Sequence, residues 1–129
     1  MPVSERERQV VQDMFDAMQA GPGGEEKMMS IFAEDAVMID PFKGEPQAYN
    51  GKAAIRQRFI DIWNEPGPQD LSLTMDQIDA EGGEVRAEWT CTSSVFKTPM
   101  KGLDVFRIED GLIKRLGMQV TAWPETDHH

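Results

Sequence analysis

The sequence has 129 residues, the size of one ordinary domain with its own core, and 13 basic against 23 acidic residues give a formal net charge of -10. This charge repels nucleic-acid phosphates and anionic lipid, so neither nucleic acid nor a membrane surface is an expected partner. A single cysteine, Cys91, excludes an internal disulfide. The sequence has neither a membrane-span pattern nor a signal-peptide pattern, and we expect a cytoplasmic protein.

Three helices are predicted in the first half of the chain. Ser4 and Glu7 form a capping box that opens a helix over residues 5–19. A Gly-Pro-Gly-Gly breaker follows, and then a short helix over residues 25–32. Asn50 is the predicted cap of the third helix, whose apolar stripe consists of Ile55, Phe59, Ile62 and Trp63, with Arg56, Gln57, Arg58 and Asp61 facing away.

The rest of the chain is predicted to form strands. A small strand over residues 36–40 ends at Pro41, and Pro46 and Tyr49 fall in the polar loop that follows. Further strands are expected over residues 71–79, 84–96, 102–108 and 112–121. This order predicts an α+β fold, a single cone-shaped domain with three N-terminal helices packed on the concave face of a curved antiparallel β-sheet.

The last hairpin determines which face of the sheet carries Asp104. A two-residue Asp110-Gly111 loop would place Asp104 beside polar or small residues of the last strand, whereas a three-residue loop over 109–111 with a glycine bulge places it beside apolar ones. The apolar match favours the longer loop. The concave face then carries Asp104 together with Phe106, Leu116, Met118 and Val120.

Histidine chemistry is excluded from the body of the domain. Both histidines, His128 and His129, stand at the carboxyl end, where we expect residues 125–129 to form a disordered tail or tag remnant beyond a domain of residues 1–124. The sequence therefore excludes sites that need histidine, namely serine–histidine triads, cysteine–histidine dyads and histidine-ligated metals. We expect no metal and no cofactor, because the sequence has no metal-binding constellation and no phosphate-binding loop.

Two carboxyl groups are the candidate acid–base groups of the domain. Asp104 interrupts an apolar strand, where burial would raise its pKa and make it a hydrogen-bond donor. Asp40 ends a short apolar strand and could act as a base beside it. A solvent-facing edge position for Asp104 and simple turn chemistry for Asp40 are the alternative interpretations.

Twelve apolar side chains would line or pack such a site, although methionine also fills irregular gaps in ordinary cores. They are Met14, Met18, Phe32, Met38, Phe42, Phe59, Trp63, Trp89, Phe106, Leu116, Met118 and Val120.

Several segments resemble the nuclear transport factor 2-like superfamily, and most closely its bacterial ketosteroid isomerases. They are FAEDAV over 32–37, Asp40-Pro41, GKAAI over 51–55 and DVFRIEDGLIKR over 104–115. The resemblance implies that Asp40 is a general base and Asp104 a protonated donor to an enolate oxygen. The family's two oxyanion-site tyrosines fall at Met14 and Phe59, and loss of one such donor typically costs roughly 10² to 10³ in rate.

The resemblance implies a small-molecule enzyme that moves a proton next to a carbonyl on an apolar cyclic ligand. A non-catalytic ligand-binding or dimerisation module is the alternative from another class, and Met14 and Phe59 favour it. Polyketide cyclisation and epoxide hydrolysis also stay open, although the latter requires an arginine inside the cone and Arg107 and Arg115 are predicted to face outward. We also expect a homodimer through the outer sheet face, near Val105 and Ile113.

Overall fold

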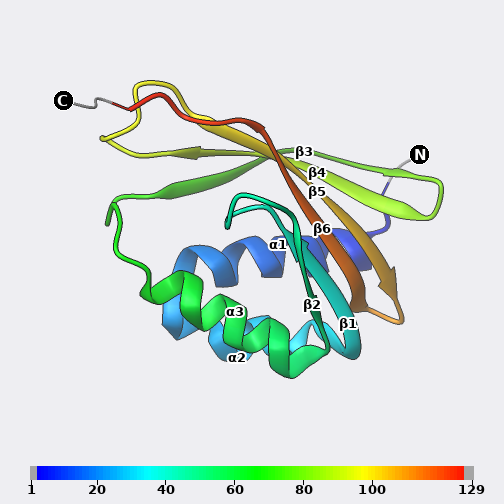
Figure 1. The fold of residues 1–129 in the computed structure, drawn as a ribbon. Helices are drawn as coiled ribbons and strands as arrows, with labels where there is room; N and C mark the ends of the chain where they lie inside the picture. Colours follow the sequence, from blue (N-terminus) through cyan, green and yellow to red (C-terminus); the bar gives the residue numbers. More distant parts are fainter. Residues whose placement is uncertain (1–2, 127–129) are drawn as a thin grey trace.

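The computed structural model describes residues 3–126, and all of its helices lie in the first half of the chain, together with two strands (Figure 1). The capping box opens α1, Glu5–Ala20, and confirms the first predicted helix. The glycine-rich breaker is a 3-10 helix, η1, Gly21–Gly24, and α2, Glu25–Ser30, ends earlier than predicted because Phe32 already begins a strand. The third helix, α3, is Lys52–Asn64, and its predicted cap is wrong: Gly51, with a φ of 92°, occupies the cap position.

Six strands form one curved sheet in the order β2-β1-β6-β5-β4-β3. The strands are β1 Phe32–Asp40, β2 Gln47–Asn50, β3 Ser72–Glu81, β4 Glu84–Thr92, β5 Met100–Glu109 and β6 Leu112–Ala122. The α+β class and the curved sheet over helices are confirmed. The sheet is mixed rather than wholly antiparallel, because β1 runs parallel to β6. The predicted loop around Tyr49 is wrong, since β2 pairs with β1 there.

The β5–β6 hairpin has the predicted faces but a different turn. Asp104 lies opposite Met118, and Phe106 lies opposite Leu116. The loop has only two residues, Asp110 and Gly111, and both adopt a positive φ, of 53° and 77°. The extra residue is instead in β6, because the register shifts between Arg107 and Ile108 and leaves Lys114 unpaired. This bulge sets the face of every residue beyond it.

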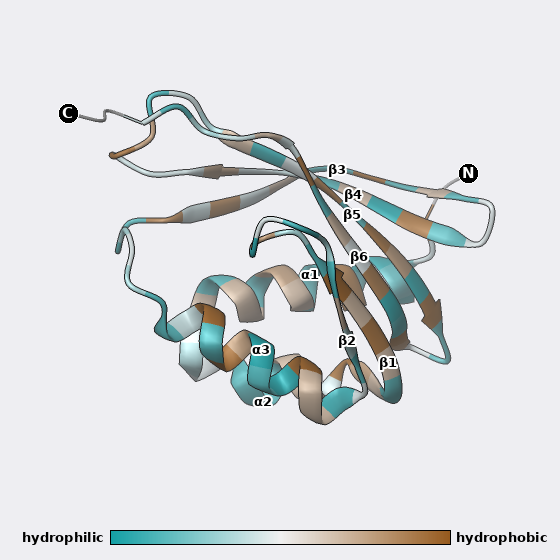
Figure 2. Ribbon diagram, in the orientation of Figure 1, coloured by the Kyte–Doolittle hydropathy of each residue, from teal (hydrophilic) through white to brown (hydrophobic). Residues whose placement is uncertain are grey.

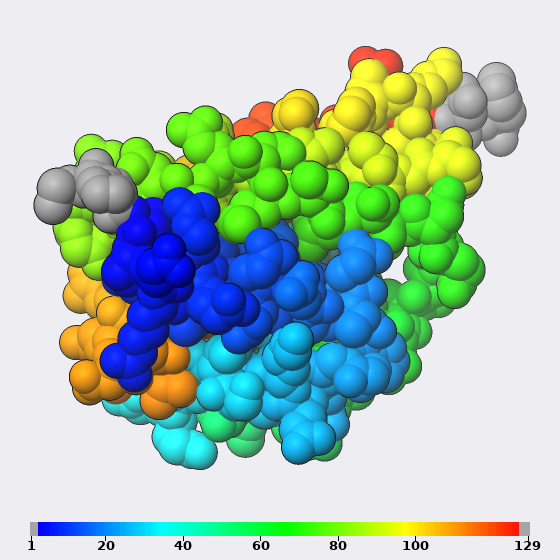
Figure 3. All heavy atoms as spheres, turned by 180° about the vertical axis from the view of Figure 1, so that it is seen from behind, coloured from blue at the N-terminus to red at the C-terminus, as the bar shows by residue number. Residues whose placement is uncertain are grey.

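The hydrophobic core fills the space between the helices and the concave face of the sheet, where the apolar segments meet (Figure 2). From behind, α1 lies between the β3–β4 hairpin and α2 (Figure 3). Ile113 is fully buried in this core, so its predicted place on an outer dimer face is wrong. Arg107 and Arg115 are exposed, as predicted. Within residues 3–126, none of the helices combines the length and the apolar character that a bilayer crossing requires.

The end of the described chain runs beside the loop between β4 and β5. The backbone N–H of Glu125 donates to the Thr98 hydroxyl at 2.9 Å, and its carbonyl accepts from the Lys97 N–H at 2.6 Å. Residues 125 and 126, which the sequence assigned to a tail, are thus hydrogen-bonded or bridged to the domain. His128 and His129 lie outside the described residues.

Candidate functional site

Asp40 and Asp104 lie in one row across the concave face of the sheet. Asp104 is opposite Met118, and Ile39 on β1 is level with Gly117, so Asp40 comes level with Met118. One strand separates the two, and with neighbouring strands about 4.8 Å apart their backbones are roughly 10 Å apart. Asp40 is 0% and Asp104 3% exposed. The sheet therefore holds two carboxyl groups inside the apolar core, on either side of one methionine.

Trp89 is the hydrogen-bond partner of Asp104. Its indole N–H donates to the Asp104 Oδ1 at 3.0 Å, and it reaches that oxygen across Gly102 on the neighbouring strand. A Cβ at position 102 would overlap indole carbons Cζ2 and Cε2 of Trp89 and come within 2.6 Å of the Gln119 carbonyl oxygen. Glycine is therefore required at 102 so that the indole can lie over the strand and reach the carboxyl group.

Burial changes the acid strength of Asp104. Asp104 is paired with Ala87 on β4 and with Met118 on β6, and both of these residues are buried members of the hydrophobic core. Burial raises the pKa of Asp104 to about 7, and the Trp89 hydrogen bond opposes this rise only in part. Near neutral pH the group thus has both protonation states available, as a general acid or base requires.

Asp40 forms a buried ion pair with Arg58, which sequence reasoning missed. The guanidinium Nε donates to Oδ2 at 2.7 Å and Nη2 donates to Oδ1 at 3.3 Å. The backbone N–H of Phe42 also donates to Oδ1, at 3.1 Å. Burial opposes the charge of Arg58, but the hydrogen bonds and charge of Asp40 outweigh it and raise the pKa of Arg58. Both oxygens of Asp40 are therefore occupied.

The predicted outward orientation of Arg58 is wrong, since the residue is 2% exposed. Its position in the sequence carries the signal: Arg58 follows Ile55 by three residues and precedes Phe59, so it lies on the helix face that these two residues bury. A charged residue on an apolar stripe requires a buried counter-charge, and Asp40 supplies it.

Tyr49 packs against the same guanidinium. The Arg58 Cζ lies 5.7 Å from the centre of the Tyr49 ring, which β2 places opposite Met38. The Tyr49 hydroxyl and the Arg58 Nη1 are buried and have no hydrogen-bond partner in the described part of the chain. The exposed Glu65 forms an ion pair with Arg58, with its Oε1 3.7 Å from Nη1, which is longer than a hydrogen bond. Two donor groups are thus left unused beside Asp40.

The twelve apolar residues predicted to line the site differ in how deeply they are buried. Met14 and Phe59, where the sequence resemblance predicts tyrosines, are 2% and 0% exposed and supply no side-chain O–H or N–H. The other buried members are Phe32, Met38, Trp89, Phe106, Leu116 and Met118, and the partly buried ones are Met18, Trp63 and Val120. Phe42 is 36% exposed and meets Trp123 edge-on at 6.5 Å, so it lies at the surface.

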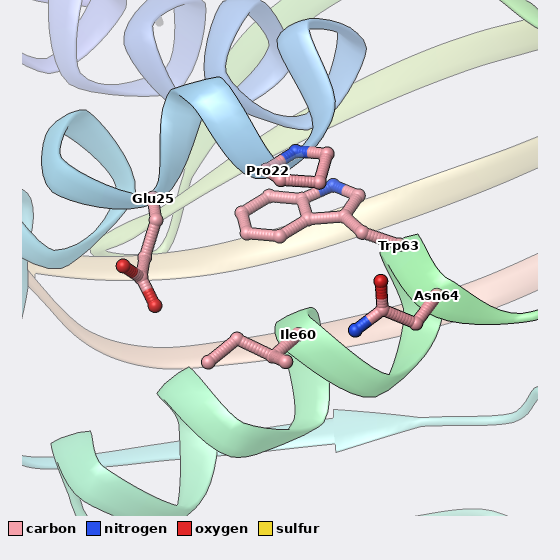
Figure 4. A pocket seen from close by; sticks show the side chains of 5 residues that line it. All are labelled: Pro22, Glu25, Ile60, Trp63 and Asn64. Atoms are coloured by element: carbon pink, nitrogen blue, oxygen red, sulfur yellow. The ribbon is translucent and has the colours of Figure 1, made fainter.

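Two surface hollows are lined by residues other than Asp40 and Asp104. One, of about 220 Å³, is lined by Pro22 and Glu25 on one side and by Ile60, Trp63 and Asn64 of α3 on the other (Figure 4). The other, of about 320 Å³, is lined by residues of β3 to β6, among them Trp89 and Gly102. Neither hollow is lined by a carboxyl group of the Asp40–Asp104 row. Among residues 3–126, no cluster of histidine, cysteine and carboxylate side chains is suited to a metal ion.

Comparison with known proteins agrees with this architecture. The model of the SnoaL-like domain family matches residues 11–116. A candidate ketosteroid isomerase from Kribbella flavida is 20% identical, with 98% of this chain and 85% of that chain covered and a TM-score of 0.72. A candidate SnoaL-like polyketide cyclase from Jannaschia sp. CCS1 is 15% identical (94% and 89% covered, TM-score 0.73). An NTF2-like protein of unknown function from Mesorhizobium loti is 17% identical (95% and 98% covered, TM-score 0.73). No curated protein sequence matches the chain.

Proposed function

The chain belongs to the SnoaL-like domain family, and from its site we propose that it is a small-molecule enzyme that transfers a proton next to a carbonyl group of an apolar cyclic substrate. The observation that carries the proposal is Asp104, a buried carboxyl group whose pKa is raised to about 7. A base with a pKa near the working pH gains both a useful ionised fraction and a strong pull on the proton. Similar structures named ketosteroid isomerase and polyketide cyclase support the substrate class.

In the proposed reaction the Asp104 carboxylate takes a proton from the carbon beside the carbonyl. The electron pair of that C–H bond moves into the new carbon–carbon double bond, and the carbonyl oxygen becomes an enolate oxygen. The neutral Asp104 then returns the proton to another carbon of the conjugated system, which shifts the double bond. Such general acid–base catalysis contributes about 10²- to 10⁴-fold in rate.

The resemblance to ketosteroid isomerases supports a different division of labour, with Asp40 as the base and neutral Asp104 as the donor. Asp40 accepts hydrogen bonds from Arg58 and from the Phe42 N–H on its two oxygens. Taking up a proton would break this ion pair inside the core. The geometry therefore favours Asp104 as the base, and the pH dependence of the rate separates the two assignments.

The experiment is turnover of a β,γ-unsaturated 3-ketosteroid, followed by the ultraviolet absorbance of the conjugated product. We expect slow turnover by the unmodified chain and a loss of at least about 10² in Asp104→Asn. Asp61→Asn is the matched control, because Asp61 lies on the exposed side of α3 and its Oδ1 accepts a hydrogen bond from the Gln57 amide. Turnover that survives in Asp104→Asn contradicts the proposal. If no ketosteroid is converted, the alternative of a non-catalytic binding module gains support.

Epoxide hydrolysis is the second candidate, and Arg58 is the observation that favours it. The reaction was disfavoured because the arginines of the sheet face outward, but Arg58 enters the core from α3 and pairs with Asp40. There, Asp104 would take a proton from the attacking water as the water oxygen bonds to an epoxide carbon and the bond from that carbon to the ring oxygen breaks. Arg58 would hydrogen-bond the released oxygen, which then takes the proton back from Asp104 to give the diol. Conversion of styrene oxide to its diol, measured by chromatography, tests this candidate, and it fails if Asp104→Asn converts the epoxide equally well.

A further inference from the structure

Two buried hydrogen-bond donors beside Asp40 are unused. They are the Arg58 Nη1 group and the Tyr49 hydroxyl, neither of which has a hydrogen-bond partner in the described chain. Leaving such groups unpaired in a core is costly, and the great majority of buried polar groups have a partner. The Glu65 Oε1 lies 3.7 Å from Nη1, which is beyond hydrogen-bond distance, so we infer that the hydrogen-bond partner of these donors is an oxygen from outside the described chain.

The ion pair with Asp40 fixes which part of the guanidinium is available. Nε and Nη2 donate to the two oxygens of Asp40, so the carboxylate occupies one edge of the planar group. Nη1 is on another edge of the guanidinium, where its N–H groups donate no hydrogen bond within the described chain. The Tyr49 ring, with its centre 5.7 Å from the Arg58 Cζ, holds the guanidinium from a further side. Asp40 and Tyr49 thus orient Arg58, and Nη1 is the donor left for a ligand.

The charges around Arg58 select the kind of oxygen. Asp40 cancels the charge of the guanidinium at 2.7 Å, and Glu65 adds a negative charge 3.7 Å from Nη1. The whole chain carries a formal charge of -10. A carboxylate or phosphate ligand would therefore meet no surplus positive charge, whereas a neutral acceptor such as a ketone oxygen can still take the hydrogen bonds.

We propose that Arg58 and Tyr49 bind the carbonyl oxygen of an uncharged ketone, and that they hold this oxygen as it becomes an enolate oxygen. The identification of this oxygen with the reacting carbonyl rests on the proposed function. When Asp104 removes the proton, its negative charge moves to this oxygen, so the total charge of the site stays the same, whereas an anionic ligand would add a charge. The hydrogen bonds from the preorganised donors strengthen as this charge develops. Arg58 and Tyr49 then supply the donors that Met14 and Phe59 cannot.

Binding of three matched probes tests this inference without any turnover. The probes are 2-tetralone, which has the ketone, tetralin, which lacks it, and 2-naphthoate, which carries a full negative charge. Dissociation constants come from backbone amide shifts in nuclear magnetic resonance titrations of the full chain. The carbonyl carbon of ¹³C-labelled 2-tetralone reports hydrogen bonding directly, because its resonance moves downfield when the oxygen accepts hydrogen bonds.

Tyr49→Phe is the first variant, since it removes only the unpartnered hydroxyl and leaves the ring under Arg58. The second is the double variant Asp40→Leu with Arg58→Met, which replaces the ion pair by apolar side chains of similar size and so keeps the core filled. Arg56→Met is the control, because Arg56 is on the same helix with its side chain 52% exposed.

We expect each test variant to weaken 2-tetralone binding about fivefold or more while tetralin binding stays unchanged, and to reduce the downfield shift of the carbonyl carbon. Three results would overturn the inference: equal changes for 2-tetralone and tetralin, a bound carbonyl resonance no further downfield than in water, or tighter Arg58-dependent binding of 2-naphthoate. Absence of 2-tetralone binding would overturn it as well.

Failure here and failure of the proposed function are distinguishable. If 2-tetralone binds through Arg58 and Tyr49 but no ketosteroid is converted, the oxygen site stands and the proposed reaction fails. If turnover depends on Asp104 while the probes bind independently of Arg58 and Tyr49, the reaction stands and this oxygen site is wrong.

Discussion

Replacing Gly102 with alanine should force the Trp89 indole away from Asp104. The added methyl group would overlap the Cζ2 and Cε2 atoms of Trp89, a side chain that is 5% exposed. The Gln119 carbonyl, 2.6 Å from the same position, blocks the other direction. Overpacking of this kind costs about 1–3 kcal/mol of folding free energy.

The same change should alter the acid strength of Asp104. The Trp89 N–H donates to the Asp104 Oδ1 at 3.0 Å and stabilises the ionised form. Hydrogen bonds to charged groups contribute about 1.5 kcal/mol or more, so losing this one raises the pKa by roughly one unit. In Gly102→Ala the pKa of Asp104 should therefore rise further above about 7. Trp89→Phe removes the same donor without adding a methyl group and should raise the pKa similarly.

Urea unfolding measures the first effect, and a ¹³C titration of the Asp104 carboxyl carbon measures the second. Gly117→Ala is the matched control, because a Cβ there meets no atom within 4 Å. If Gly102→Ala is as stable as Gly117→Ala and its Asp104 titrates as in the unmodified chain, the described contact between Trp89, Gly102 and Asp104 is wrong.

Two further predictions concern stability. Asp40→Asn leaves the Arg58 charge buried without its counter-charge and should lower the free energy of unfolding, measured in urea, by about 3–5 kcal/mol. The control Asp35→Asn breaks an exposed ion pair with Lys114 and should lower it little. Equal losses in the two variants would contradict the buried ion pair. Stability should also fall as the pH rises from about 4 to about 7, because the native Asp104 holds its proton above the pKa of 3.8 expected in the unfolded chain, and should level off above pH 7. Asp104→Asn should lack this decline in urea unfolding, and a decline of the same size in the variant would assign it to other groups.

The position of Asp104 could be predicted because local patterns determine it. Apolar residues alternate through β5 and β6, and only one choice of face leaves Phe106, Leu116 and Met118 together. The turn itself was predicted wrongly: the register that the apolar match requires comes from a bulge at Lys114, three residues after the end of the expected loop. A bulge leaves no strong signal in the sequence. The faces that result from it are visible in the sequence, because they set the alternation of apolar residues.

Other features depend on partners that are distant in the sequence. β2 has only four residues, which are mostly polar and lie at the sheet edge, so no alternation identifies it. The parallel pairing of β1 with β6 joins segments about eighty residues apart, and nothing within β1 indicates its neighbour. The spacing of Arg58 from Ile55 and Phe59 indicates its buried helix face, but its partner Asp40 lies 18 residues earlier on another element and is not indicated by the sequence. The unused donors of Tyr49 and Arg58 depend on the ion pair between Arg58 and Asp40, so the sequence alone does not predict them.

The pH dependence of kcat/KM for the β,γ-unsaturated 3-ketosteroid tests the central claim most directly, because it reports the ionisation of the free enzyme. With Asp104 as the base, the rate should rise through about pH 7 and level off above it, and this rise should be absent from Asp104→Asn. A rate that instead falls through the same range would assign Asp104 as the neutral donor, and a rise that persists in Asp104→Asn would remove it from the reaction.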